Sequence, residues 1–115
     1  MTILCYDKCS TCKKALQWLD AKGAKYTVRP IKEENPSAEE LRVWWIQSGL
    51  PLRRFFNTSG MLYRDLGLKD KLDSMPEDEQ LRLLASDGML VKRPLLVSNK
   101  AVIPGFKEKD WEKLL

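Results

Sequence analysis

The spacing of apolar and polar residues predicts a strand, a helix and a second strand in the first part of the chain. Residues 2–6 form a short apolar run that is typical of a buried strand. Residues 11–22 carry apolar side chains at helical spacing, and Gly23 follows as a helix-ending glycine. Residues 25–29 alternate like a strand that Pro30 limits. Such a unit predicts two parallel strands with a right-handed crossover.

The middle of the chain, residues 36–88, has a helical pattern throughout. Ser37 is a plausible N-cap with Glu40 three residues later, which predicts a capping box. Apolar residues then continue at helical spacing until Gly49. Shorter helical pieces are predicted at residues 51–56, 62–66, 69–74 and 75–85.

The last part of the chain returns to strands and ends in a helix. Residues 91–97 and 101–103 predict two short strands joined by a tight turn, which is the pattern of a hairpin. Residues 107–115 predict a terminal helix with Trp111, Leu114 and Leu115 on its inward side.

The order of these elements defines an α/β fold. A βαβ half is followed by a helical insert and then by a C-terminal ββα half. We therefore expect a thioredoxin-like fold with a helical insert between the two halves. A chain of 115 residues is long enough for one core, so residues 1–115 are expected to form a single domain. Its thioredoxin-like core would comprise residues 1–35 and 89–115, and its insert residues 36–88.

Two cysteines three residues apart, Cys9 and Cys12, lie between the first predicted strand and the first helix. The N-terminus of a helix carries unpaired N–H groups and partial positive charge, which stabilise a thiolate over a thiol. The thiolate is the reactive form of cysteine. We therefore expect Cys9 to be a nucleophile and Cys12 to be its resolving partner. Cys5 lies within the first strand and is expected to be a small core residue.

The composition restricts how these thiols can be activated. The chain has three cysteines and no histidine, and its net charge is +4. Without histidine there is no Cys–His activation, so Lys or Arg and the helix end must supply it. One CxxC motif offers two of the four ligands of a usual zinc site, so no metal is expected. The mild, dispersed positive charge does not indicate nucleic-acid binding.

The sequence shows no pattern of export or membrane insertion. No apolar stretch approaches the length of about 18 residues that a membrane span needs. Residues 1–6 begin a strand pattern directly, without the features of a secretory signal. We therefore expect a cytoplasmic protein with no membrane partner. Three cysteines in such a protein favour thiol chemistry over a structural disulfide framework.

The chain resembles the ArsC/Spx family in three motifs that occur in the family's order. They are Cys9-Ser-Thr-Cys12-Lys-Lys-Ala, Tyr63-Arg-Asp-Leu-Gly-Leu68 and Lys92-Arg93-Pro94-Leu-Leu-Val97. Members of this family are thioredoxin-fold proteins with a helical insert. They include glutathione/glutaredoxin-linked arsenate reductases and Spx-type regulators that bind RNA polymerase. The resemblance covers nearly the whole chain.

The resemblance implies roles for individual residues. Cys9 would be the catalytic cysteine, and Arg93 would lie close to it and contact an anionic substrate or stabilise the thiolate. Pro94 matches the family's cis-proline beside the active site. The expected catalytic residues are Cys9, Cys12 and Arg93. The expected substrate-binding residues are Ser10, Thr11, Arg93 and Pro94.

The chain departs from the arsenate reductases at three places. Asn57 occupies the position of one of their arginines, and residues 103–106 contain no arginine where they have another. Cys12 stands where they keep a serine, which favours an internal disulfide. A tetrahedral dianion needs several charge-assisted donors, and only Arg93 is matched here.

The function expected from the sequence is therefore that of a thiol–disulfide oxidoreductase with a Cys9–Cys12 redox pair. Its partners would be an oxidised thiol substrate and a thiol reductant. No resident cofactor is expected, and glutathione, thioredoxin or glutaredoxin would supply the electrons. One alternative is a glutathione/glutaredoxin-linked arsenate reductase. The other is an Spx-type redox-sensing transcriptional regulator that binds RNA polymerase.

Overall fold

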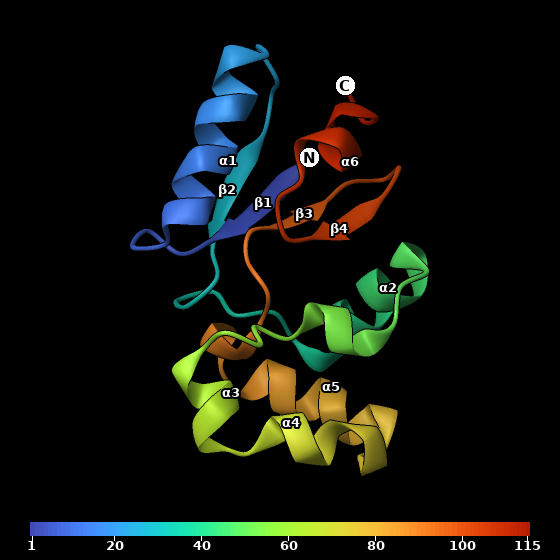
Figure 1. Ribbon diagram of the computed structural model, residues 1–115. Helices are drawn as coiled ribbons and strands as arrows, with labels where there is room; N and C mark the ends of the chain where they lie inside the picture. Colours follow the sequence, from blue (N-terminus) through green and yellow to red (C-terminus); the bar gives the residue numbers. More distant parts are fainter.

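The computed structural model describes residues 1–115 and contains one four-stranded sheet (Figure 1). Its strands are β1 (Thr2–Cys5), β2 (Thr27–Pro30), β3 (Leu95–Val97) and β4 (Val102–Pro104). They lie in the order β2-β1-β3-β4. β2 runs parallel to β1, whereas β3 is antiparallel to both β1 and β4. The predicted parallel pair and the predicted hairpin therefore belong to one sheet.

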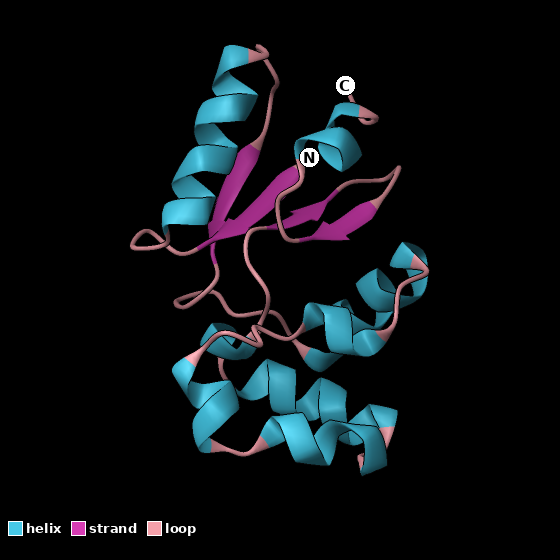
Figure 2. Ribbon diagram, in the orientation of Figure 1, coloured by secondary structure: helices cyan, strands magenta, loops and turns pink.

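Helices lie on both sides of this sheet (Figure 2). On one side, α1 (Ser10–Ala21) connects β1 to β2, and α6 (Glu108–Glu112) follows β4. The other side holds the insert, which runs from green to orange in Figure 1. Its elements are α2 (Ala38–Ser48), η1 (Leu52–Phe55), α3 (Met61–Asp65), α4 (Leu68–Lys71), η2 (Leu72–Ser74), α5 (Glu77–Ser86) and η3 (Gly88–Leu90). The predicted thioredoxin-like fold with a helical insert is confirmed. None of the helices combines the length and the apolar character that crossing a bilayer requires.

Strand β1 is buried on both faces and separates two apolar layers. Ile3 and Cys5 pack with α1 and with Trp111 of α6. Leu4 packs instead into a larger cluster that contains most of the buried side chains of the insert. Successive side chains of a strand point to opposite faces, so one short strand contributes to both layers.

The insert begins with the predicted capping box. The Glu40 N–H donates to Ser37 Oγ at 3.1 Å, and the Ser37 N–H donates to Glu40 Oε1 at 3.0 Å. Glu40 also receives both Nη groups of Arg29 in β2, at 2.7 and 3.0 Å. The Arg29 guanidinium lowers the pKa of Glu40 to about 2. A bidentate pair of this kind ties the start of α2 to the sheet.

The insert returns to the sheet through a close backbone approach at Gly88. A Cβ atom at this position would lie 1.9 Å from the carbonyl oxygen of Ile31. Ile31 directly follows β2 and is fully buried, so its backbone has little room to move away. Only glycine fits this contact without a shift of the backbone.

The predicted strand over residues 91–97 is too long. β3 begins only at Leu95, directly after a cis bond between Arg93 and Pro94. Before that bond, the Lys92 N–H donates to the Phe55 carbonyl oxygen at 2.8 Å. The backbone of this segment therefore pairs with the insert and not with the sheet.

The C-terminal helix is also shorter than predicted, because α6 ends at Glu112. Trp111 is fully buried as expected, and its Nε1 donates to the Gly105 carbonyl oxygen at 3.0 Å. Leu115 was expected to point inward, but it is 54% exposed. It lies beyond the helix and so leaves the apolar side that Trp111 occupies.

Replacing Glu40 by Gln is expected to lower the free energy of unfolding at pH 7 by about 1–2 kcal/mol, because it weakens a part-exposed ion pair and a cap. The folded-state pKa of Glu40 lies below its ordinary value of 4.5. Its contribution is therefore complete above that value and is lost as the pH falls toward about 2. The stability difference between wild type and E40Q should narrow from pH 5 to pH 3.5 in urea denaturation.

Glu39→Gln is the matched control, because Glu39 lies in the same helical turn, is exposed and forms no ion pair. Equal losses of stability in both variants would contradict the role given to Glu40. So would a difference between wild type and E40Q that stays constant as the pH falls.

Candidate active site

The CxxC motif follows β1 and forms the start of α1. Cys9 is the N-cap residue of α1, and no side chain caps this helix end. The Cys9 N–H donates to the Tyr6 carbonyl oxygen at 3.0 Å, which closes the turn between strand and helix. The first N–H groups of α1 therefore have no capping side chain, and such a helix end favours a negative charge.

The two sulfur atoms of the motif differ in exposure. Cys9 is half-buried, whereas Cys12 is only 1% exposed. Both cysteines are free thiols in this structure, as is Cys5. Because solvent does not reach Cys12, a substrate in solution can approach Cys9 but not Cys12.

Cys12 lies against Cys5 of β1 in the apolar layer under α1. A hydrogen bond from the Cys12 thiol to the Cys5 sulfur, together with burial, raises the pKa of Cys12 far above its usual range. The same hydrogen bond lowers the pKa of Cys5. Cys5 is buried as expected, but it also touches Cys12 of the CxxC motif. Its position at the end of β1, on the face toward α1, was the signal available in the sequence.

Arg93 lies on the segment that leads into β3. Its Nη1 donates to the Met89 carbonyl oxygen at 3.2 Å. Its Cζ lies 5.2 Å from the centroid of the Tyr6 ring, which is a cation–π distance. The Nε atom is buried and has no hydrogen-bond partner. Buried donors are usually satisfied, so Arg93 keeps unused capacity to bind an acceptor.

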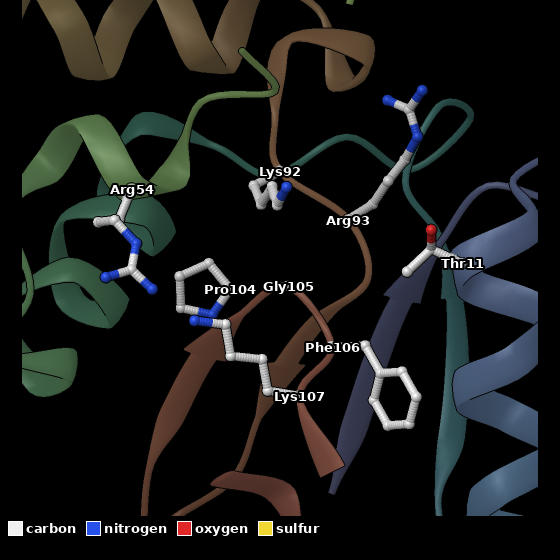
Figure 3. A pocket seen from close by; sticks show the side chains of 8 residues that line it. All are labelled: Thr11, Arg54, Lys92, Arg93, Pro104, Gly105, Phe106 and Lys107. Carbon is white, nitrogen blue, oxygen red and sulfur yellow. The ribbon is translucent and has the colours of Figure 1, made fainter. Parts of the chain in front are cut away.

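A cavity of about 350 Å³ lies between the start of α1, the entry to β3 and the end of β4 (Figure 3). Four of its lining side chains are positively charged, and none is a carboxylate. The lining residues are Thr11, Arg54, Lys92, Arg93, Pro104, Gly105, Phe106 and Lys107. The cavity can therefore hold an anionic group. Nowhere in the chain do three or more His, Cys, Asp or Glu side chains gather in a way that could hold a metal ion.

The structure brings some of the predicted site residues together and leaves others apart. Thr11 and Arg93 meet in the cavity, whereas Ser10 is exposed and does not line it. Pro94 is buried in the cis bond that the resemblance implied, and its carbonyl oxygen accepts the Gly105 N–H at 2.8 Å. Cys9 packs at the margin of the layer under α1 and is not among the residues that line the cavity.

Arg93 is one of four positively charged side chains at this cavity. Arg54, Lys92 and Lys107 line the same cavity. None of these three residues is among the site residues expected from the sequence. The only signal was their charge, because spacing does not tell that Arg54 of η1, Lys92 before β3 and Lys107 before α6 line the same cavity.

Fold and site together define the class: a thioredoxin-like domain with a helical insert, a CxxC motif at the start of its first helix and a cis-proline before its third strand. The model of the ArsC family matches residues 4–114. The chain belongs to the ArsC family.

Two relatives show the range of this family. YusI of Bacillus subtilis strain 168, an uncharacterised protein, is 53% identical over 113 residues, which are 98% of this chain and 96% of YusI. The regulatory protein MgsR of the same strain is 28% identical over 99% of this chain and 89% of its own length.

Solved structures agree with the fold. A Bacteroides fragilis protein described as related to the ArsC family is 51% identical and superposes with a TM-score of 0.96, covering 99% of this chain and 97% of that one. A Streptococcus mutans protein described as a possible arsenate reductase is 47% identical, with a TM-score of 0.88 and 96% of each chain covered.

Replacing Cys5 by Ala is expected to lower the pKa of Cys12, because the variant removes the acceptor of the Cys12 thiol. Cys5→Ser keeps a hydrogen-bond acceptor and should leave the pKa of Cys12 high. The measurement is a pH titration of the Cys12 Cβ resonance by carbon NMR, with Cys9 replaced by Ser so that one thiol of the motif remains. A Cys12 that titrates at the same pH in C5A and wild-type backgrounds would disprove the contact.

Proposed function

We propose that this protein is a thiol–disulfide oxidoreductase in which Cys9 is the nucleophile and Cys12 the resolving thiol. The observation that carries the proposal is the difference in exposure between the two sulfurs at the start of α1. Cys9 is open to a substrate, whereas Cys12 is 1% exposed and lies behind it. Membership of the ArsC family and the thioredoxin-like fold support the same chemistry.

The proposed reaction transfers two electrons in two exchanges. In the first, the Cys9 thiolate attacks one sulfur of a substrate disulfide, a Cys9–substrate disulfide forms, and the leaving thiolate takes up a proton. In the second, Cys12 loses its proton and attacks the Cys9 sulfur, which releases the second substrate thiol. The product is a reduced substrate and a Cys9–Cys12 disulfide. Two external thiols, from two glutathione molecules or from one thioredoxin or glutaredoxin, then reduce this disulfide, become a disulfide themselves and complete the cycle.

The surroundings of the two thiols support this division of roles. The raised pKa of Cys12 keeps it protonated while Cys9 reacts, so only one sulfur competes for the substrate. Cys9 is the N-cap of α1 and Cys12 lies three residues later in its first turn, a spacing at which a disulfide can close. Arg93 and Thr11, which line the cavity beside this helix end, would contact the substrate. We place the reaction in the cytoplasm, where thiol reductants keep such a pair in turnover.

Replacing Cys9 by Ser should lower the rate of disulfide reduction by at least about 1,000-fold, because it removes the nucleophile. Cys12→Ser should retain the first exchange but not the second, so the variant accumulates a mixed disulfide on Cys9. Mass spectrometry of both variants after exposure to a disulfide peptide checks this difference. A C9S variant that keeps full activity, or a C12S variant that releases product at the wild-type rate, would refute the mechanism.

A second candidate function is arsenate reduction. It is favoured by the four positive side chains of the cavity, which offer charge-assisted donors although two of the family's arginines are absent. The structural similarity to the Streptococcus mutans protein is consistent with it.

One measurement distinguishes the two candidate functions: the arsenate-dependent oxidation of a coupled thiol reductant. We expect arsenate to add no turnover above the reaction without protein, because Asn57 and residues 103–106 lack the donors that the arsenate reductases use. Turnover that requires arsenate and is lost in the variant Arg93→Gln would replace the first proposal with arsenate reduction.

A regulatory role is the remaining alternative, and the similarity to the regulatory protein MgsR supports it. In this interpretation the Cys9–Cys12 disulfide is a switch and RNA polymerase is the partner. Binding of RNA polymerase to the oxidised protein but not to the reduced protein would favour this role over the enzymatic one.

A further inference from the structure

Six basic side chains line two adjoining cavities beside the CxxC motif. The first is the cavity of about 350 Å³ described above, and the second, of about 560 Å³, lies between η1, β4 and α6. Both are lined by Arg54 and Lys107, so they are neighbours along one surface, which we call the basic groove. The basic side chains are Arg54, Lys92, Arg93, Lys100, Lys107 and Lys113. Asp110 is the one carboxylate that lines it.

None of these six side chains takes part in an ion pair, whereas four basic residues elsewhere do. The contrast is clearest within η1. Arg53 pairs with Asp73 at 2.7 Å, but Arg54, the next residue, faces the groove without a partner. Like charges gathered on one surface repel one another, and an anionic ligand would remove that repulsion.

The positive charges do not converge on one point. Figure 3 shows Arg54 and Lys107 reaching toward the same side of Pro104, whereas the guanidinium of Arg93 extends away from them on the side of Thr11. A single tetrahedral anion therefore cannot contact all of them. The second cavity adds Lys100 and Lys113 farther from the motif. An extended ligand with several separate negative charges fits this distribution.

The second cavity also has an apolar component, to which Leu50, Val102 and Leu114 contribute. The combined size of both cavities lies in the range that holds a drug-sized molecule or several side chains, and it exceeds what one oxyanion fills. Carboxylates separated by apolar side chains are characteristic of an acidic polypeptide segment. Lys and Arg bind carboxylates through charge-assisted hydrogen bonds.

We propose that the basic groove binds an acidic segment of the polypeptide whose disulfide Cys9 attacks. The proposal rests on the proposed oxidoreductase function and adds the class of its substrate: a disulfide-containing protein with Asp and Glu residues near the reacting cysteine. The segment would extend from the start of α1 toward α6, with its carboxylates at Arg54 and Lys107. Charge complementarity would speed association and select among oxidised proteins.

The test compares three disulfide peptides that differ only in four residues beside the cysteine, which are all Glu, all Gln or all Lys. We expect kcat/KM for the Glu peptide to exceed that for the Gln peptide by about tenfold at low salt, and the Lys peptide to be the poorest substrate. The advantage of the Glu peptide should shrink as salt screens the charges. Glutathione disulfide serves as a small anionic substrate for comparison.

Two variants test whether the preference for the Glu peptide arises in the basic groove. Arg54→Gln and Lys107→Gln should each lower the ratio of kcat/KM for the Glu peptide to that for the Gln peptide. Both side chains are exposed and free of hydrogen bonds and ion pairs, so the variants should melt like the wild type. Arg53→Gln is the matched control, because Arg53 lies in the same short helix but pairs with Asp73. It should leave the ratio unchanged.

The outcomes separate this proposal from the one on which it rests. Equal kcat/KM values for the three peptides, or reduction of glutathione disulfide as efficient as that of the Glu peptide, would overturn the acidic segment and leave the oxidoreductase intact. Reduction of no disulfide would overturn the proposed function instead. In that case, binding of the reduced Glu peptide, measured by calorimetry, tests the groove directly. Binding that R54Q and K107Q lose supports it, and absence of binding to wild type overturns it.

Discussion

The structure depends on the covering of β1 from both sides. The alternation of its side chains sends Ile3 and Cys5 into the layer under α1 and α6, and Leu4 into the layer that the insert completes. Because Cys5 is the last residue of β1 and α1 begins shortly afterwards, the same pleat places Cys5 against Cys12. The burial of Cys12, and with it the difference between the two thiols of the motif, follows from this arrangement.

The site combines two environments that meet at the start of α1. On the protein side, the thiols of Cys5 and Cys12 share an apolar layer, which disfavours charge on Cys12. On the solvent side, the basic groove concentrates positive charge without carboxylate partners in its first cavity. Arg93 joins the two environments, because it stacks on Tyr6 near the motif and also lines the groove. In a chain without histidine, the positive charge beside the CxxC motif comes from Lys and Arg side chains, whereas Cys12 is buried on the apolar side.

The helical insert is part of the site because it is held to the sheet at several points. The ion pair of Arg29 with Glu40 joins β2 to the start of α2, and the close approach of Gly88 to Ile31 brings the chain back beside β2. Between these two points, η1 presents Arg54 to the groove. The backbone bond from Lys92 to Phe55 then aligns the entry to β3 with η1. A change in how the insert packs would therefore change the charge beside the CxxC motif, although no residue of the insert belongs to that motif.

Local signals in the sequence were sufficient for the order of the elements, the thioredoxin-like fold, the capping box of Ser37 and Glu40, and the position of CxxC at a helix start. Each of these depends on residues a few positions apart, whose spacing and chemistry act within one turn or one strand. The tertiary structure alone decided three features. They are the contact of Cys12 with Cys5, the start of β3 only at Leu95, and the position of Arg54 and Lys107 at the same cavity. The first depends on packing between β1 and α1. The other two depend on packing and backbone pairing among η1, β3 and α6, which are distant in the sequence. No local pattern records which of many apolar and basic side chains will meet, because that depends on how the layers close around β1.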